Sequence, residues 1–151
     1  MPKSQYNDAI RLKGRSTIRA YPAGTIKSYL DKSIEGLPEP IYENTVDNLV
    51  VSAGKGFVCD LMLDEEAVGL TYHAIGTDST PPAAGDTVLA AEVARKTWTT
   101  RNRTGAVMTY SVFYLAAECA HNIAECGTFG GAAATAAADS GTLFSHYLQA
   151  Y

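Results

Sequence analysis

Short stretches that alternate apolar and polar residues, separated by turn-forming residues, recur along the chain and predict β-strands. Alternation over 16–21 and 25–30, on either side of Pro22-Ala23-Gly24, predicts a β-hairpin. Further strands are expected at 70–75, 93–101, 106–116, 123–129 and 142–148. About seven to nine short strands with frequent turns are typical of an antiparallel β-sandwich. The expected fold is therefore mainly β, a jelly-roll-like sandwich with one short helix.

The region after residue 51 has the spacing of that helix. Ser52 is placed to cap it, and its apolar residues recur about every 3.6 positions, so that they share one face. These residues are Ala53, Phe57, Val58, Leu61 and Met62. Gly54 and Gly56 each lower the helix propensity by about 1 kcal/mol relative to alanine, so tertiary packing must hold the helix. A close approach to a neighbouring strand would explain the glycines, and so would simple tolerance.

The segments 93–101 and 106–116 are expected to be two long strands joined by a turn at 102–105. Neither face of the second strand is strongly polar, which fits a strand covered on both sides, by an additional layer or by another subunit. Trp98, Tyr110 and Tyr114 are expected to pack between strands or sheets. The alternative for these three aromatic residues is an exposed contact surface for a glycan or a protein.

Composition indicates one globular domain. The chain has 151 residues, of which 46% are hydrophobic and 19% charged, and its longest apolar runs fall well short of the ~20 residues that span a bilayer. The polar start lacks the apolar stretch of a secretory signal, so synthesis and assembly in a cytoplasm are expected, without a membrane partner. We divide the chain into an N-terminal arm at 1–15 and a single β-sandwich domain at 16–151.

Charge is distributed unevenly between the N-terminal region and the rest of the chain. Residues 1–34 include seven basic and two acidic residues, a net charge of +5, while the rest of the chain has a net charge of −9. Such a contrast can place a basic arm on an acidic partner, although a solvated surface with chance clustering explains it equally well. Candidate interface residues in the arm are Lys3, Arg11, Lys13 and Arg15. Nucleic acid is a weaker candidate partner, because the basic residues are dispersed and no recognition motif accompanies them.

Cysteine and histidine raise the question of a metal or catalytic site. Cys119, His121 and Cys126 lie close in sequence, with Cys59 and His73 elsewhere, but their spacing has no strong metal-binding precedent. Cys119 and Cys126 could form a disulfide across neighbouring strands once the protein leaves the cytoplasm. No nucleophile motif surrounds any cysteine. We therefore expect buried, unreactive cysteines, no catalytic residues, no metal and no cofactor.

Several short motifs follow one another in a characteristic order. Asn48-Leu49-Val50-Val51 leads into the glycine-containing helix, and Ile75-Gly76-Thr77, Asp86-Thr87 and the Glu-x-x-Arg segment from Glu92 to Arg95 follow. The stretches 122–129 and 140–144 then complete a closing hairpin. This order resembles small virion structural proteins of tailed bacteriophages, over roughly two thirds of the chain. Residues 1–40 show no firm match to that pattern.

The resemblance implies a part of a phage particle with the same β-sandwich architecture. We expect a noncatalytic virion protein that packs against copies of itself, as a trimer, and against major capsid or tail proteins. A capsid decoration protein on the outer shell is favoured by the short single domain and the absence of shaft repeats. The alternatives are a tail, collar, baseplate or tail-fibre-associated protein, and a surface glycan-binding module.

Overall fold

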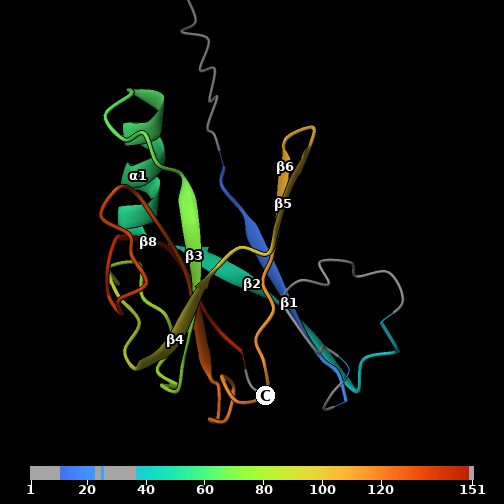
Figure 1. Ribbon diagram of the computed structural model, residues 1–151. Coiled ribbons are helices and arrows are strands. Elements are labelled where there is room, and N and C mark those ends of the chain that lie inside the picture. The colour runs from blue at the N-terminus through green and yellow to red at the C-terminus, as the bar shows by residue number, and fades with distance from the viewer. Residues whose placement is uncertain (1–10, 23–24, 26–36, 150–151) are drawn as a thin grey trace, which may run out of the picture.

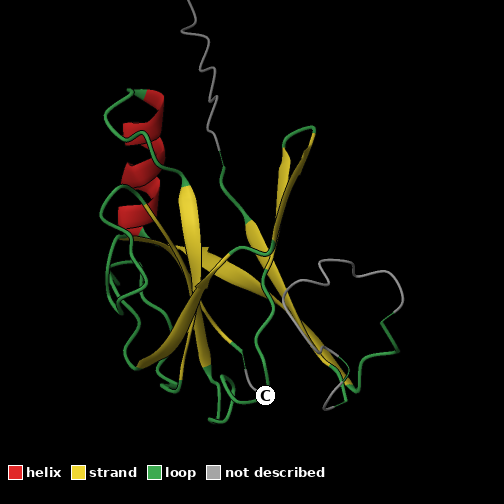
Figure 2. Ribbon diagram, viewed as in Figure 1, coloured by secondary structure: helices red, strands yellow, loops and turns green. Residues whose placement is uncertain are grey.

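The computed structural model describes residues 11–22, 25 and 37–149, and it is built from eight antiparallel strands and one helix (Figures 1 and 2). The elements are β1 (Gly14–Ala20), β2 (Tyr42–Val50), α1 (Ser52–Met62), β3 (Leu70–Gly76), β4 (Glu92–Thr97), β5 (Thr100–Thr104), β6 (Val107–Ser111), β7 (Glu125–Gly130) and β8 (Thr142–Leu148). Six strands form one curled sheet in the order β1-β2-β8-β7-β3-β4, and β5 and β6 form a separate hairpin. The predicted fold class, mainly β and sandwich-like with one short helix, is confirmed.

The first strand pairs with a segment that the sequence did not indicate. β1 lies antiparallel to β2 along its whole length, from Gly14 opposite Asn48 to Ala20 opposite Tyr42. The partner expected for this strand, 25–30, lies outside the described residues apart from Thr25. Because β1 begins at Gly14, the strand includes the last two residues of the expected arm, while residues 1–10 lie outside the described part.

Only the end of β2 joins the central sheet, through Leu49 opposite His146 and Val50 opposite Ser145. The rest of β1 and β2 extends beyond the sheet as a two-stranded ribbon. Ile18 and Val46 on the inner side of this ribbon pack against a cluster of Ile75, Ile123, Cys126 and Tyr147. The ribbon therefore covers part of one face of the sheet, which we call the ribbon face.

A second hydrophobic cluster lies on the opposite face, which we call the loop face. It consists of Val51, Ala74, Leu89, Phe129 and Leu143, all buried. Because successive residues of a strand point to opposite faces, Ala74 and Ile75 of β3 belong to different clusters. The central strands β3 and β7 are thus covered on both sides, and their consecutive buried residues follow from this.

Helix α1 packs on β8 through its glycine-containing first half. A methyl group at Gly54 would lie 2.1 Å from the carbonyl oxygen of Phe144, so the close approach to a strand explains this glycine. Gly56 has open space around it, so tolerance explains the other. The N-cap is Val51 rather than Ser52, and no side chain bonds to the exposed N–H groups. Contrary to expectation, Leu61 and Met62 do not share the buried face with Phe57, because the helix extends past the edge of the sheet.

The long strand expected at 93–101 is two strands. β4 belongs to the main sheet and β5 to the hairpin, with Trp98 and Thr99 between them. β6 ends at Ser111, well before residue 116, and the hairpin turn is the two-residue Gly105-Ala106, with Gly105 at φ 58°. The chain changes sheets at Trp98, so that the hairpin projects away from the body (Figure 1).

Helices long and apolar enough to cross a membrane are absent from the described residues.

Candidate interaction surface

The β5–β6 hairpin presents two different faces. Arg101 pairs with Tyr110 and Arg103 with Met108 across the strands, so these four side chains share one face. Thr100, Asn102 and Thr104 lie on the other face with their partners from β6. Val107 and Met108 are 64% and 59% exposed. The prediction of a covering layer within the chain is therefore wrong for the outer half of this hairpin, and burial against another molecule stays a prediction.

The base of the hairpin is held on the body by aromatic side chains. Trp98 stacks on Tyr110 with ring centroids 4.7 Å apart, and its indole N–H donates to the carbonyl oxygen of Leu70 (3.1 Å). Trp98 and Tyr114 both lie against the ring of His73, at centroid distances of 5.9 and 5.8 Å. Trp98 and Tyr114 thus contact His73, Tyr110 contacts Trp98, and all three predicted aromatic residues are half-buried. This arrangement agrees with the packing role expected for them and gives the projecting hairpin a fixed base.

Hydrogen bonds around His73 form one ordered chain. The Tyr114 hydroxyl donates to the His73 carbonyl oxygen (2.8 Å), so it accepts from the His73 Nδ1–H (3.0 Å). The Ser16 hydroxyl donates to Tyr147 (2.8 Å), and the Tyr147 hydroxyl can donate to Nε2 of His73 (2.8 Å). A neutral ring satisfies every one of these bonds. Burial lowers the pKa of His73 to about 4, because charging the ring there would cost desolvation.

The predicted basic interface residues of the arm that the structure describes lie at the start of β1 and just before it. Lys3 lies outside the described residues, while Arg11 and Lys13 are exposed just before β1. Arg15 lies opposite Asp47 and pairs with it at 3.2 Å. The ribbon also pairs Arg19 with Glu43. Such exposed pairs contribute about 0–1 kcal/mol each, so they match the two strands electrostatically without adding much stability.

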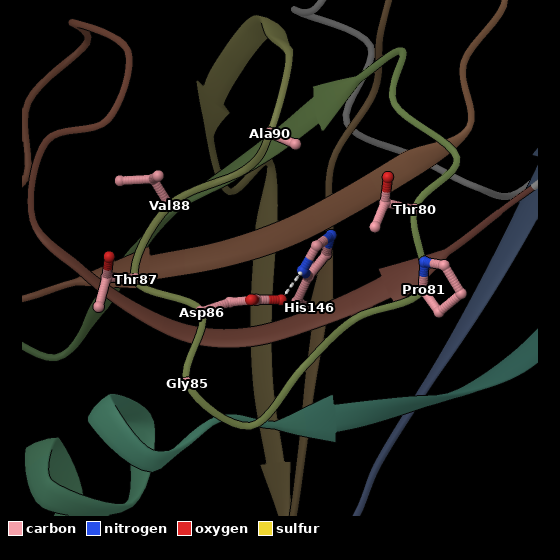
Figure 3. A pocket seen from close by; sticks show the side chains of 8 residues that line it. All are labelled: Thr80, Pro81, Gly85, Asp86, Thr87, Val88, Ala90 and His146. Carbon is pink, nitrogen blue, oxygen red and sulfur yellow. Dashed lines mark hydrogen bonds and ion pairs between the residues drawn. The ribbon is translucent and has the colours of Figure 1, made fainter.

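A buried polar cluster lies on the loop face, beside a pocket of about 330 Å³ (Figure 3). His146 of β8 contacts Asp86 through Nδ1 (2.7 Å) and Glu125 through Nε2 (3.1 Å). Glu125, only 1% exposed, also accepts the backbone N–H groups of Ala90 (3.1 Å) and Ala91 (2.7 Å). The Ala83 N–H and His146 both lower the pKa of Asp86. This cluster fastens the loop between β3 and β4 onto the sheet.

The polar atoms of this cluster bond to one another and to the backbone. A general base needs a lone pair directed at a substrate proton. Both ring nitrogens of His146 are already directed at carboxylates, and both Glu125 oxygens accept bonds. These bonds join the sheet to the loop between β3 and β4, so we call the cluster a structural clamp.

A second clamp explains the Glu-x-x-Arg motif. Arg95 pairs with Glu92 by two bonds, and both side chains are almost fully buried. Its Nη1 also donates to the carbonyl oxygens of Thr135 (3.3 Å) and Ser140 (2.8 Å), and its guanidinium lies over the ring of Phe129 (4.3 Å). The motif thus fixes the alanine-rich loop between β7 and β8 on the sheet.

The three cysteines, which all lie in the described part of the chain, are free thiols, and Cys119 packs against the cluster that contains Cys126 without a disulfide between them. Cys59 is exposed on α1, Cys119 is half-buried, and burial raises the pKa of Cys126 to about 12. His121 is exposed. Within 11–22, 25 and 37–149, no three His, Cys, Asp or Glu side chains come together as metal ligands would. A buried thiol with a raised pKa is a poor nucleophile, so Cys126 acts as a core residue.

Sequence reasoning missed the clamp formed by Glu125, His146 and Asp86. The available signal was Glu125, a carboxylate inside a strand that is otherwise apolar or small, since such a residue must find partners when buried. Its partners come from segments 21 to 35 residues away, which the sequence does not connect. Comparison with protein-family models, curated proteins and solved structures gives no match to this chain.

Proposed function

We propose that this chain is a noncatalytic structural subunit of a bacteriophage particle, placed on the outer shell as a capsid decoration protein. It packs against copies of itself, as a trimer, and against the major capsid protein. The order of motifs from Asn48 to Arg95 suggests the class of protein, and the projecting hairpin is the observation that carries the proposal. A tail, collar, baseplate or fibre attachment is the alternative placement, which the experiment below separates from the shell.

The hairpin supports an interaction role because apolar side chains at its tip are exposed to water, which is unfavourable in an isolated chain. Val107 and Met108 expose most of their apolar surface at the tip, although the base is anchored through Trp98 and Tyr110. Burying an apolar side chain of this size contributes about 1.5–3 kcal/mol. A rigid projection with apolar residues at its tip is suited to bind a partner with little loss of conformational entropy.

The buried polar groups support the noncatalytic part of the proposal. Their hydrogen bonds join loops to the sheet, at His146 on one face and at His73 on the other. A glycan-binding module fits less well, because sugar-binding aromatic rings need an open face. Trp98 and Tyr110 stack on each other, and the Tyr114 hydroxyl is bonded within the protein.

Particle incorporation of a tip variant tests the proposal. Val107→Asp combined with Met108→Asp should reduce the amount of protein on assembled particles at least about tenfold, since charges would replace the apolar contact. Ile41→Asp, at a position 67% exposed before β2, is the matched control and should be incorporated normally. Circular dichroism verifies that both variants fold.

The copy number of the wild-type protein on purified particles then separates the placements. A number comparable to that of the major capsid protein indicates the shell, and one comparable to a tail protein indicates the tail. The protein's absence from purified particles would overturn the proposed function.

A further inference from the structure

Two exposed regions of the molecule combine apolar side chains with unpaired charge of opposite sign. The hairpin patch consists of Arg101, Arg103 and Met108, which share one face of the hairpin, while Val107 lies on the other face beside the turn. The helix-end patch lies where α1 ends, and it consists of Asp60, Leu61, Met62, Leu63 and Glu65. Met62 and Leu63 are 71% and 67% exposed, which is as high as the exposure of the hairpin tip. Each patch therefore offers apolar area with charges beside it.

The charges of both patches differ from most others in having no ionic partner. Within the described residues, Arg15, Arg19, Arg95 and Lys96 each pair with a carboxylate. Arg101 and Arg103 form no ion pair there, and the Arg103 guanidinium donates to the carbonyl oxygen of Gly105. The helix-end carboxylates, including Asp64, likewise have no ionic partner among the described residues. The two patches are thus complementary in both charge and polarity.

The fold prevents these patches from meeting within one chain. α1 and the hairpin rise from opposite sides of the same end of the molecule (Figure 1). A hairpin that meets a helix end must therefore meet the helix end of a neighbouring copy. Such a contact joins two different surfaces head to tail, and it closes into a ring when the rotation between copies permits. A ring of three copies would agree with the proposed trimer.

We propose that the hairpin patch of one copy docks on the helix-end patch of the next copy, with Arg101 and Arg103 facing Asp60 and Glu65. This contact rests on the proposed structural role and specifies the partner of the hairpin within the assembly. Met108 covers Met62 and Leu63 in this arrangement, which removes exposed apolar side chains of both patches from water. The flanking charges set the order of the copies.

Charge exchange between two variants tests the contact. The hairpin variant carries Arg101→Glu and Arg103→Glu, and the helix-end variant carries Asp60→Lys and Glu65→Lys. Each variant alone brings like charges together, so its dissociation constant should rise about tenfold or more. In an equimolar mixture the acidic hairpin of one variant meets the basic helix end of the other, and the unchanged hairpin meets the unchanged helix end, so unlike variants should pair. A ring of three copies cannot alternate two variants, so the mixture should form mixed dimers or alternating assemblies with an even number of copies. Sedimentation velocity over a concentration series measures both effects.

The control variant, Glu39→Lys, reverses a charge at an exposed position outside both patches, and it should associate as the wild type does. Association by either variant alone at wild-type strength would overturn the proposed contact, as would a mixture in which the two unlike variants do not pair while both remain folded. Loss of association in the hairpin variant alone would point to a hairpin–hairpin contact or an acidic partner such as nucleic acid. These results would leave the proposed virion role standing, since particle incorporation tests that role separately.

Discussion

The two faces of the central sheet each bury one histidine, and they surround it with different chemistry. On the ribbon face, His73 lies between the hydroxyl groups of Tyr114 and Tyr147. On the loop face, His146 lies between the carboxylates of Asp86 and Glu125. Both rings are more than nine-tenths buried, and both nitrogens of each ring have partners. The same side chain at similar depth therefore serves a neutral network on one face and an ionic cluster on the other.

The difference shows what each face has to hold. The tyrosines fix the base of the hairpin and the end of β1, which approach the sheet with apolar and aromatic surface. Uncharged hydrogen bonds suffice there and avoid the desolvation of a charge. On the loop face, Glu125 must satisfy two backbone N–H groups of the chain that leads into β4. A carboxylate can accept several bonds at once, so it can fasten an irregular segment that has no strand partner.

The largest effect on stability is expected from breaking the cluster of Glu125, His146 and Asp86. Glu125→Ala leaves the N–H groups of Ala90 and Ala91 and one nitrogen of His146 without their acceptor, so it should lower the free energy of unfolding by about 3–5 kcal/mol. Glu125→Gln keeps the shape and part of the bonding, so its loss should be smaller. Urea unfolding at neutral pH measures both.

Glu39→Ala is the control for this cluster, because Glu39 is exposed, and it should change stability by less than about 0.5 kcal/mol. A loss below about 1 kcal/mol for Glu125→Ala would show that the cluster does not stabilise the loop face.

Lowering the pH should have the second-largest effect on stability, through His73 on the ribbon face. With its pKa lowered to about 4, His73 stays neutral in the folded protein, while the unfolded chain takes up a proton near pH 6.5. The unfolded state then binds more protons, so stability falls as pH falls from about 6.5 to 4, by at most about 1.4 kcal/mol per pH unit and about 3 kcal/mol in total. Asp86, whose pKa is lowered, adds its own loss only below its usual pKa.

A His73→Gln variant isolates this contribution, because every other titrating group is shared. Urea unfolding of both proteins at a series of pH values should give the variant a shallower slope between pH 6.5 and 4. Identical slopes would mean that His73 takes up its proton in the folded protein as readily as in the unfolded chain.

The smallest effect on stability is expected from substitutions that test how closely α1 packs on β8. Gly54→Ala places a methyl group against the backbone of Phe144, so it should destabilise by about 1–3 kcal/mol despite the better helix propensity of alanine. Gly56→Ala has open space and should stabilise by up to about 1 kcal/mol. Thermal unfolding compares the pair, and effects of equal sign would contradict the close packing of the helix on β8.

Much of the fold could be predicted from local pattern. The strand before Gly76 and the last two strands, with the loop between them, lie close to where alternation and glycine placed them. The helix around Phe57 was also located correctly, because apolar spacing depends only on neighbouring residues. The site was harder to predict: Trp98, Tyr110 and Tyr114 could be named as a packing group, but the contacts of Trp98 and Tyr114 with His73 could not.

The sequence by itself determined the mainly β class, most strand positions and the glycine-rich helix, since these follow from periodicity within a few turns or strands of chain. Tertiary structure alone decided that β1 pairs with β2 and that the chain passes from the main sheet to the hairpin at Trp98. It also decided that His146 meets both Asp86 and Glu125. The physical reason is that pairing partners and burial depend on contacts between distant segments. Alternation shows which residues share a face of a strand, and only the folded chain shows what covers that face.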